Sequence, residues 1–135
     1  MTRQIVVCLD GTWNDPTEQT NVYKLFRRLP GAEQPVPHDG ALRAHLRKES
    51  PGVLGLYLEG VGAEGRSQGI LGGSLGLGLH DRVIDAFILV SQIYRPGDKL
   101  WIFGFSRGAW SARSLAGFIA KAGLLDDALA PAAPD

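Results

Sequence analysis

The stretch LWIFGFSRGAWSAR, residues 100–113, runs from a bulky apolar segment into a glycine-flanked serine and then into an alanine-rich segment. The apolar part is typical of a buried β-strand, and the part after the serine has the periodicity of a helix. The pattern Gly-x-Ser-x-Gly occurs three times, around Ser67, Ser74 and Ser106. Only Ser106 has a predicted strand directly before it and a predicted helix directly after it, since the other two lie in a glycine-dense segment.

A strand-to-helix turn of this kind can present a nucleophile. A serine hydroxyl attacks a substrate well only when a base removes its proton, so the oxygen must be open to a base and to the substrate. In a nucleophile elbow the residues two before and two after the serine are small, because a Cβ there would strike the neighbouring strand or helix. Gly104 and Gly108 occupy these positions around Ser106. A tight turn with an unreactive serine remains the alternative.

Backbone N–H groups near Ser106 are expected to stabilise negative charge on a substrate oxygen. The helix after the serine presents its N-terminal N–H groups and its dipole, so Arg107 is the expected first donor. A second donor is expected from the loop DGTWND, which follows the first predicted strand, with Gly11 and Thr12 as the candidates. Asp10 and Thr12 fit equally well a turn in which the aspartate bonds its own backbone.

The order of elements predicts an α/β fold, with a parallel sheet between two layers of helices. Residues 31–52 are expected to form a variable loop with a short helix, 61–78 a glycine-rich loop, and 126–135 a flexible tail. Strands are expected over 4–9, 53–60 and 99–103, and helices over 21–29, 79–94 and 109–123.

Composition narrows the classes of function. The 135 residues suit one domain, and 14 basic side chains balance 14 acidic ones, which disfavours a nucleic-acid partner. Cys8 lies in an apolar run and is expected to be a buried hydrophobe. No metal or other cofactor is predicted. The sequence shows neither a signal peptide nor an integral membrane segment, so a cytoplasmic location is expected where the protein is made.

Three quoted segments carry a resemblance to a known family. They are DGTWND, YLEGVGAEG and GLGLHDRVIDAFILVSQIYRPGDKLWIFGFSRGAWSARSLAGFIAKAGLL. The resemblance extends over most of the chain apart from residues 31–52. The chain resembles the α/β-hydrolase family that includes the catalytic domains of type VI secretion phospholipase effectors. The resemblance implies an esterase or lipase fold with Ser106 as the nucleophile and a lipid or other ester as the substrate. It also implies that secretion by a route without a signal peptide is open to the protein.

The histidines depart from the pattern of this family. In α/β hydrolases the triad aspartate and histidine follow the serine along the chain. Here no histidine follows Ser106, since His38, His45 and His80 all precede it. The sequence is therefore similar to the N-terminal part of the domain. Without a general base, the chain alone is expected to be nearly inactive.

The acidic residues and the sheet lead to the same expectation. Asp126 and Asp127 lie too near the end of the last predicted helix to be convincing triad acids. In the hydrolase topology, the strand before the elbow gains its outer neighbour from later sequence, so here it is expected to be an uncovered apolar edge. A complementary chain or a C-terminal half would complete it.

Three other functions are alternatives. The segment CLDGTWN resembles the DxDGT motif of haloacid-dehalogenase phosphatases, but Cys8 replaces the aspartate that would attack phosphate and bind Mg²⁺. A non-catalytic, truncated hydrolase-fold module would account for the missing base. Nucleotide binding by GGSLGLG is weaker, because this segment has no Gly-Lys-Ser/Thr and does not directly follow a strand.

Overall fold

The apolar run QIVVCL forms β1 (Gln4–Leu9), the central parallel strand of the sheet. The structure is a computed structural model, and it describes residues 2–36, 45–60 and 79–125. Side chains of β1 alternate between two apolar clusters, one on each face of the sheet. Cys8 is wholly buried, as expected, and burial raises the pKa of its thiol to about 12. The Cys8 thiol therefore stays protonated at neutral pH.

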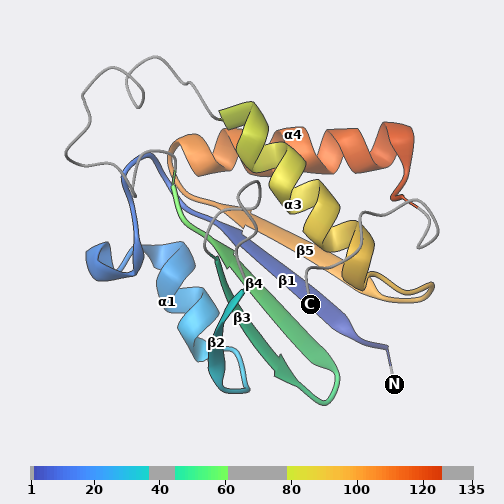
Figure 1. The fold of residues 1–135 in the computed structure, drawn as a ribbon, viewed down its shortest axis with the longest axis horizontal. Coiled ribbons are helices and arrows are strands. Elements are labelled where there is room, and N and C mark those ends of the chain that lie inside the picture. Colours follow the sequence, from blue (N-terminus) through green and yellow to red (C-terminus); the bar gives the residue numbers. More distant parts are fainter. Residues whose placement is uncertain (1, 37–44, 61–78, 126–135) are drawn as a thin grey trace.

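Five strands form one sheet in the order β2-β3-β4-β1-β5 (Figure 1). β4 (Val53–Leu58) and β5 (Lys99–Gly104) flank β1 and run parallel to it. β2 (Glu33–Val36) and β3 (His45–Ser50) extend the sheet beyond β4 with antiparallel pairing. The predicted α/β class is confirmed, but the prediction of three strands in a purely parallel sheet is wrong, because the sheet is mixed.

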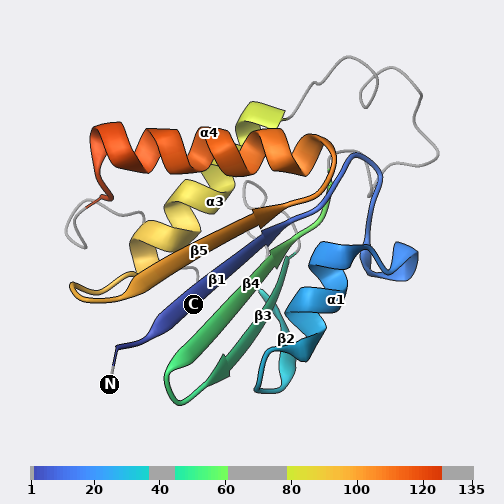
Figure 2. The ribbon, with the colours of Figure 1, turned by 180° about the vertical axis from the view of Figure 1, so that it is seen from behind.

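Helices cover both faces of this sheet (Figures 1 and 2). α3 (Leu79–Ile93) and α4 (Arg107–Ala122) lie on one face, where their apolar side chains meet those of β1 and β4. α1 (Asn21–Arg28) lies on the other face, and the short 3-10 helix η1 (Pro16–Glu18) precedes it. In the described part of the chain, the boundaries of α1, α3 and α4 lie within two residues of those predicted from the sequence.

The segment expected as a loop with a short helix instead contains β2 and β3. Its basic residues resemble the solvated face of a helix, but Lys48 is buried in β3. The Lys48 ammonium donates to the carbonyl oxygens of Arg27 and Leu29 at 2.7 and 2.8 Å. These carbonyls belong to the C-terminal end of α1, where backbone acceptors lack helical partners. The charge therefore caps a helix, which no periodicity within the segment could indicate.

Several expectations lie outside the described residues. The glycine-rich loop over 61–78, with Ser67 and Ser74, is among them. So are His38 and the tail over 126–135, which includes Asp126 and Asp127.

An ion pair joins the first residues of β1 to the start of β5. The Arg3 guanidinium donates to Asp98 Oδ2 at 2.5 Å through Nη2 and at 3.1 Å through Nε. Arg3 Nη2 also donates to the Ile93 carbonyl at the end of α3. The Asp98 side chain is 7% exposed, and its hydrogen bonds with Arg3 lower the pKa of the carboxyl group.

Asp98→Asn should reduce stability in a pH-dependent way. The lowered pKa means that ionised Asp98 favours the folded state, and this contribution is complete above the unfolded-state pKa of about 3.9 and is lost as pH falls through the folded-state pKa. We expect a loss of about 1–3 kcal/mol at pH 7 in urea unfolding, shrinking at strongly acidic pH. Glu49→Gln, which breaks the exposed pair with Arg47, should cost less than about 1 kcal/mol. Equal losses in both variants would contradict this assignment.

Candidate active site

Ser106 lies between the end of β5 and the first residue of α4, which is the strand-to-helix turn that the sequence predicts. Its φ of 54° and ψ of −125° are rare for a residue with a side chain, and such backbone strain is concentrated at functional sites. Ser106 is exposed, and its hydroxyl makes no capping hydrogen bond to α4. The turn therefore holds the side chain open to solvent at the carboxyl end of the sheet.

The two glycines that flank Ser106 lie where no side chain fits. A Cβ on Gly104 would lie 2.3 Å from the Gly108 carbonyl oxygen. A Cβ on Gly108 would lie 2.3 Å from the oxygen of Leu9 and 2.4 Å from that of Asp10. Any side chain at position 108 would therefore push the first turn of α4 away from the end of β1.

The loop after β1 passes directly against Ser106. A Cβ on Gly11 would lie 2.9 Å from the Cβ of Ser106, so the structure brings these two predicted residues together. Asn14 donates its N–H to the Gly11 carbonyl at 2.8 Å, which closes a turn, and the Gly60 N–H donates to the Asn14 carbonyl at 2.9 Å. Trp13, within the turn, has a φ of 62°. This loop is therefore a tight, hydrogen-bonded turn anchored beyond the end of β4.

Asp10 anchors the start of the loop through hydrogen bonds to its side chain, and Ser106 is not among its hydrogen-bond partners. The Asp10 side chain accepts hydrogen bonds from the Gly11 N–H at 2.8 Å, the Thr20 hydroxyl at 2.8 Å and the Tyr57 hydroxyl at 2.6 Å. Asp10 is 4% exposed and Tyr57 is wholly buried. Burial, followed by the hydrogen bond to Asp10, raises the pKa of Tyr57. Asp10 therefore links three segments of the chain around a single buried carboxylate.

The sequence analysis did not identify Tyr57 or Thr20 as part of this arrangement. Thr20 is also the N-cap of α1, where its hydroxyl accepts from the Tyr23 N–H at 3.3 Å. Tyr57 was counted within an apolar strand. The available signal was a phenol in a run of buried residues, because a buried hydroxyl needs a hydrogen-bond partner.

The backbone donors near Ser106 differ in what they already bind. The Gly11 N–H donates to its neighbouring carboxylate, as described above, so it does not match the predicted role of an open donor. Among the described residues, no acceptor binds the Thr12 N–H. The Gly108 and Ala109 N–H groups donate to the carbonyls of Phe105 and Ser106 at 2.8 and 2.9 Å. Arg107 is the residue with which α4 begins.

The described residues provide no histidine hydrogen-bonded to Ser106. His45 is the first residue of β3 and pairs with Leu58, so its backbone lies at the same edge of the sheet but three strands away from β5. His80 lies in the first turn of α3, with its ring edge-on to Trp110 and 5.6 Å between ring centroids. Within the described ranges, no group of three or more His, Cys, Asp or Glu side chains could hold a metal ion.

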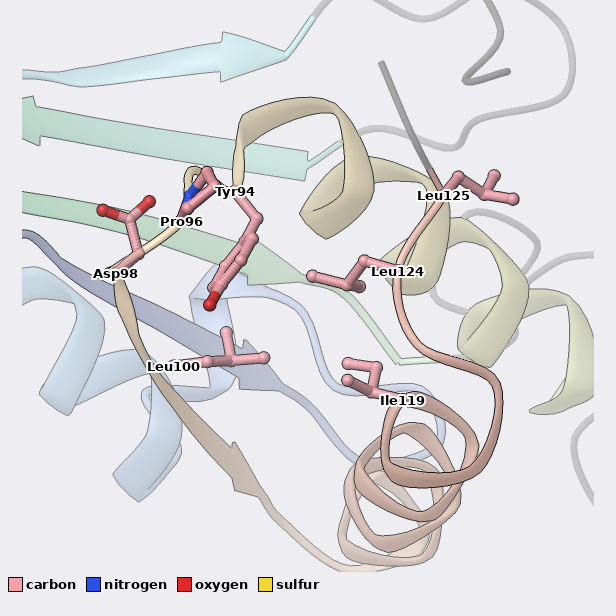
Figure 3. Close-up of a pocket in the computed structure, with 7 residues that line it drawn as sticks. All are labelled: Tyr94, Pro96, Asp98, Leu100, Ile119, Leu124 and Leu125. Atoms are coloured by element: carbon pink, nitrogen blue, oxygen red, sulfur yellow. The ribbon is translucent and has the colours of Figure 1, made fainter. Parts of the chain in front are cut away.

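A hollow of about 610 Å³ lies at the other end of the sheet (Figure 3). Tyr94, Leu100, Ile119 and Leu124 line it, and Figure 3 shows their side chains around one space. Leu100 is at the start of β5, whereas Ser106 follows the end of that strand. This hollow is therefore separate from the turn that carries Ser106.

The chain is similar to part of a longer protein from yeast. The chain is 30% identical over 135 residues to the uncharacterized protein YEL023C of Saccharomyces cerevisiae, an alignment that covers 94% of this chain and 19% of that protein. The chain thus spans about a fifth of the length of this relative. No solved structure matches this chain. No helix in the described part of the chain is long and apolar enough to cross a membrane.

Residues 3–134 match the family described as T6SS, phospholipase effector Tle1-like, catalytic domain. This match confirms the resemblance carried by the DGTWND and GFSRG segments, and it covers nearly the whole sequence. The chain belongs to the Tle1-like family of type VI secretion phospholipase effectors, within the region that forms their catalytic domain.

Proposed function

We propose that this chain supplies the nucleophile and the oxyanion-binding loop of a serine hydrolase that cleaves ester bonds in lipids. Membership of a phospholipase effector family supports this class of reaction. The observation that carries the proposal is the strained, exposed backbone of Ser106. A relaxed turn would satisfy the connection between β5 and α4 without strain, so the strain points to a role for the side chain.

In the proposed reaction, the Ser106 Oγ attacks the ester carbonyl carbon while a general base takes the hydroxyl proton. The carbonyl oxygen becomes an anion, and the backbone N–H groups of Arg107 and Thr12 are proposed to donate to it. Collapse of this intermediate expels the alcohol, which takes a proton, and leaves an acyl group on Ser106 that water then removes. The base and its acidic partner are proposed to come from sequence beyond the described residues.

Asp10 is assigned a positioning role in this scheme. Its carboxylate already accepts from three donors, so it is poorly placed to orient a catalytic histidine. The same bonds fix the start of the DGTWND loop, and with it the direction of the Thr12 N–H. The phosphatase alternative gains no support, because Cys8 is wholly buried where a phosphatase would present its nucleophile.

The fold is proposed to be the N-terminal part of an α/β-hydrolase-like domain that another segment completes at β5. Among the described strands β5 lies at an edge of the sheet. Trp101 and Phe103 lie on the face of β5 that corresponds to the α1 side of the sheet, and they are 47% and 40% exposed. On that face, α1 covers the neighbouring strands but not β5 (Figure 2). Exposed aromatic side chains on an unpaired edge favour a further strand and cover, from a complementary chain or from the rest of a longer protein.

Ser106→Ala should abolish covalent labelling of the full-length gene product by a fluorophosphonate probe, because the probe reacts with an activated serine oxygen. The matched control is Ser111→Ala in the same helix, which should keep the label. Ser111 is buried and its hydroxyl has no partner within the described part of the chain, so its loss costs little. Label that survives Ser106→Ala would remove Ser106 from the nucleophile role.

Tyr57→Phe should slow fluorophosphonate labelling by about tenfold while the protein stays folded, because the loop loses one of the bonds that orient it. Tyr23→Phe is the control, since Tyr23 packs edge-on against Tyr57 but makes no hydrogen bond to Asp10. Rates are compared at equal folded fraction, measured by circular dichroism. Equal rates in the two variants would show that the Tyr57 hydroxyl has no part in positioning.

Phe103→Thr should destabilise the full-length gene product by about 2–4 kcal/mol in urea unfolding, because the proposed cover would bury this ring. Ile84→Thr on α3, at a side chain that is 50% exposed, should cost less than about 1 kcal/mol. A cost for Phe103→Thr as small as that for Ile84→Thr would mean that β5 remains an open edge in the whole protein.

A further inference from the structure

One face of α4, the helix whose N-cap is Ser106, carries a hollow that ester cleavage itself does not require. Residues four, seven and eight positions along a helix share a face with the first residue, because the helix repeats every 3.6 residues. From Ser106 these positions are Trp110, Arg113 and Ser114. Together with Ala109 they line a hollow of about 500 Å³. The hollow therefore begins about one helical turn along α4 from Ser106, although Ser106 itself does not line it.

Trp110 presents its ring to this space. Its side chain is 46% exposed, although tryptophan is among the residues with the most apolar surface to bury. The ring is held by an edge-on contact with His80, at an interplanar angle of 74°. Long side chains on a helix lean toward its N-terminus, which in α4 is the end that carries Ser106. The indole therefore adds a partly exposed apolar surface to the lining of the hollow, near the end of α4 that follows Ser106.

Arg113 brings a positive charge that nothing in the described part of the chain neutralises. It is exposed, and it makes no ion pair or hydrogen bond with a described residue, whereas Arg3 and Arg47 each pair with a carboxylate. Asp81, an exposed acid beside His80 on α3, makes no ion pair with Arg113 either. A guanidinium fork matches the oxygens of a phosphate, to which it can donate two parallel hydrogen bonds.

The spacing along α4 suits a ligand with two separated groups. Arg113 lies seven residues after Ser106, or roughly 10 Å along the axis at about 1.5 Å per residue. The backward lean of the side chain brings the guanidinium closer to Ser106 than this. A neutral glyceride has no group that would use the charge. A phospholipid carries a phosphodiester a few bonds from its ester, so it can engage Ser106 and Arg113 at once.

We propose that Trp110 and Arg113 form a subsite for the phosphodiester headgroup of a phospholipid, with Arg113 binding the phosphate oxygens and Trp110 packing against the adjoining glycerol and headgroup. This inference rests on the proposed function of Ser106, because the subsite selects among esters that Ser106 would attack. It makes this face of α4 the part of the site that distinguishes phospholipids from neutral lipids.

The test compares two soluble esters in the full-length gene product: dihexanoylphosphatidylcholine and dihexanoylglycerol, which share acyl chains. Arg113→Gln should lower kcat/KM for the phospholipid by about tenfold to a hundredfold, the usual effect of losing a charged hydrogen bond, and change that for dihexanoylglycerol less than about twofold. Arg28→Gln removes the same charge from α1 on the other face of the sheet and should leave both values unchanged. An equal loss on both esters, or no loss on either, overturns the proposal.

A binding arm separates this inference from the proposed function. In Ser106→Ala, dihexanoylphosphatidylcholine should change the fluorescence of Trp110, a signal assigned by its loss in Ser106→Ala/Trp110→Phe. Adding Arg113→Gln should weaken binding by about tenfold or more. If wild type cleaves neither ester but this binding holds, the proposed reaction fails and the subsite stands. Binding that is indifferent to Arg113, or inorganic phosphate that binds as tightly as the lipid, overturns the headgroup assignment.

Discussion

The candidate site depends on a close backbone contact between the first turn of α4 and the end of β1. Gly108 packs so tightly against the carbonyls of Leu9 and Asp10 that a single Cβ would enter their van der Waals radii. This contact places α4 over the sheet at the edge where β1 and β5 end together. Leu9 and Gly104, the last residues of these two strands, are register partners. Because β5 and α4 are both fixed in place, Phe105 and Ser106 must make the whole change of direction between them. Ser106 therefore takes a strained backbone conformation. Exposure of its hydroxyl follows from this packing.

The buried Asp10 carboxylate also fixes the structure at this edge of the sheet. Leaving Asp10 unsatisfied in the interior would cost several kcal/mol, so its three donors are held in a narrow geometry. Those donors come from the loop itself, from the N-cap of α1 and from β4, and the β4 donor, Tyr57, is 47 positions from Asp10. The loop against Ser106 is thus tied to both the sheet and the helix on its far face. Such a network suits a site in which backbone N–H groups must already be aligned before a substrate arrives.

The sequence predicts features that local sterics decide and misses those that depend on distant partners. Gly104 signals the turn because a Cβ there would strike Gly108 and Ala109, only four and five positions along the chain. The contact of Gly108 with the end of β1 is long-range, but its place two residues after the serine makes it part of the same local pattern. β3 escaped prediction because Lys48 is charged, and its burial makes sense only once the carbonyls at the end of α1 are beside it. Likewise, Gly11 and Thr12 could not be ranked as donors from their spacing alone. The Gly11 N–H is taken by a carboxylate whose orientation depends on Tyr57, 47 positions from Asp10.

Net charge and local charge lead to different conclusions about partners. The 14 positive and 14 negative side chains cancel over the chain, which argues against long-range attraction to a polyanion. Screening, however, limits exposed charges to a range of about 8–10 Å at physiological salt, so the sum over the molecule says little about one hollow. An anion in the hollow on α4 would interact mainly with Arg113 and with the nearby N-terminal half of the helix. A net charge of zero is therefore compatible with the proposed discrimination, within one site, between an ester that carries a phosphate and one that does not.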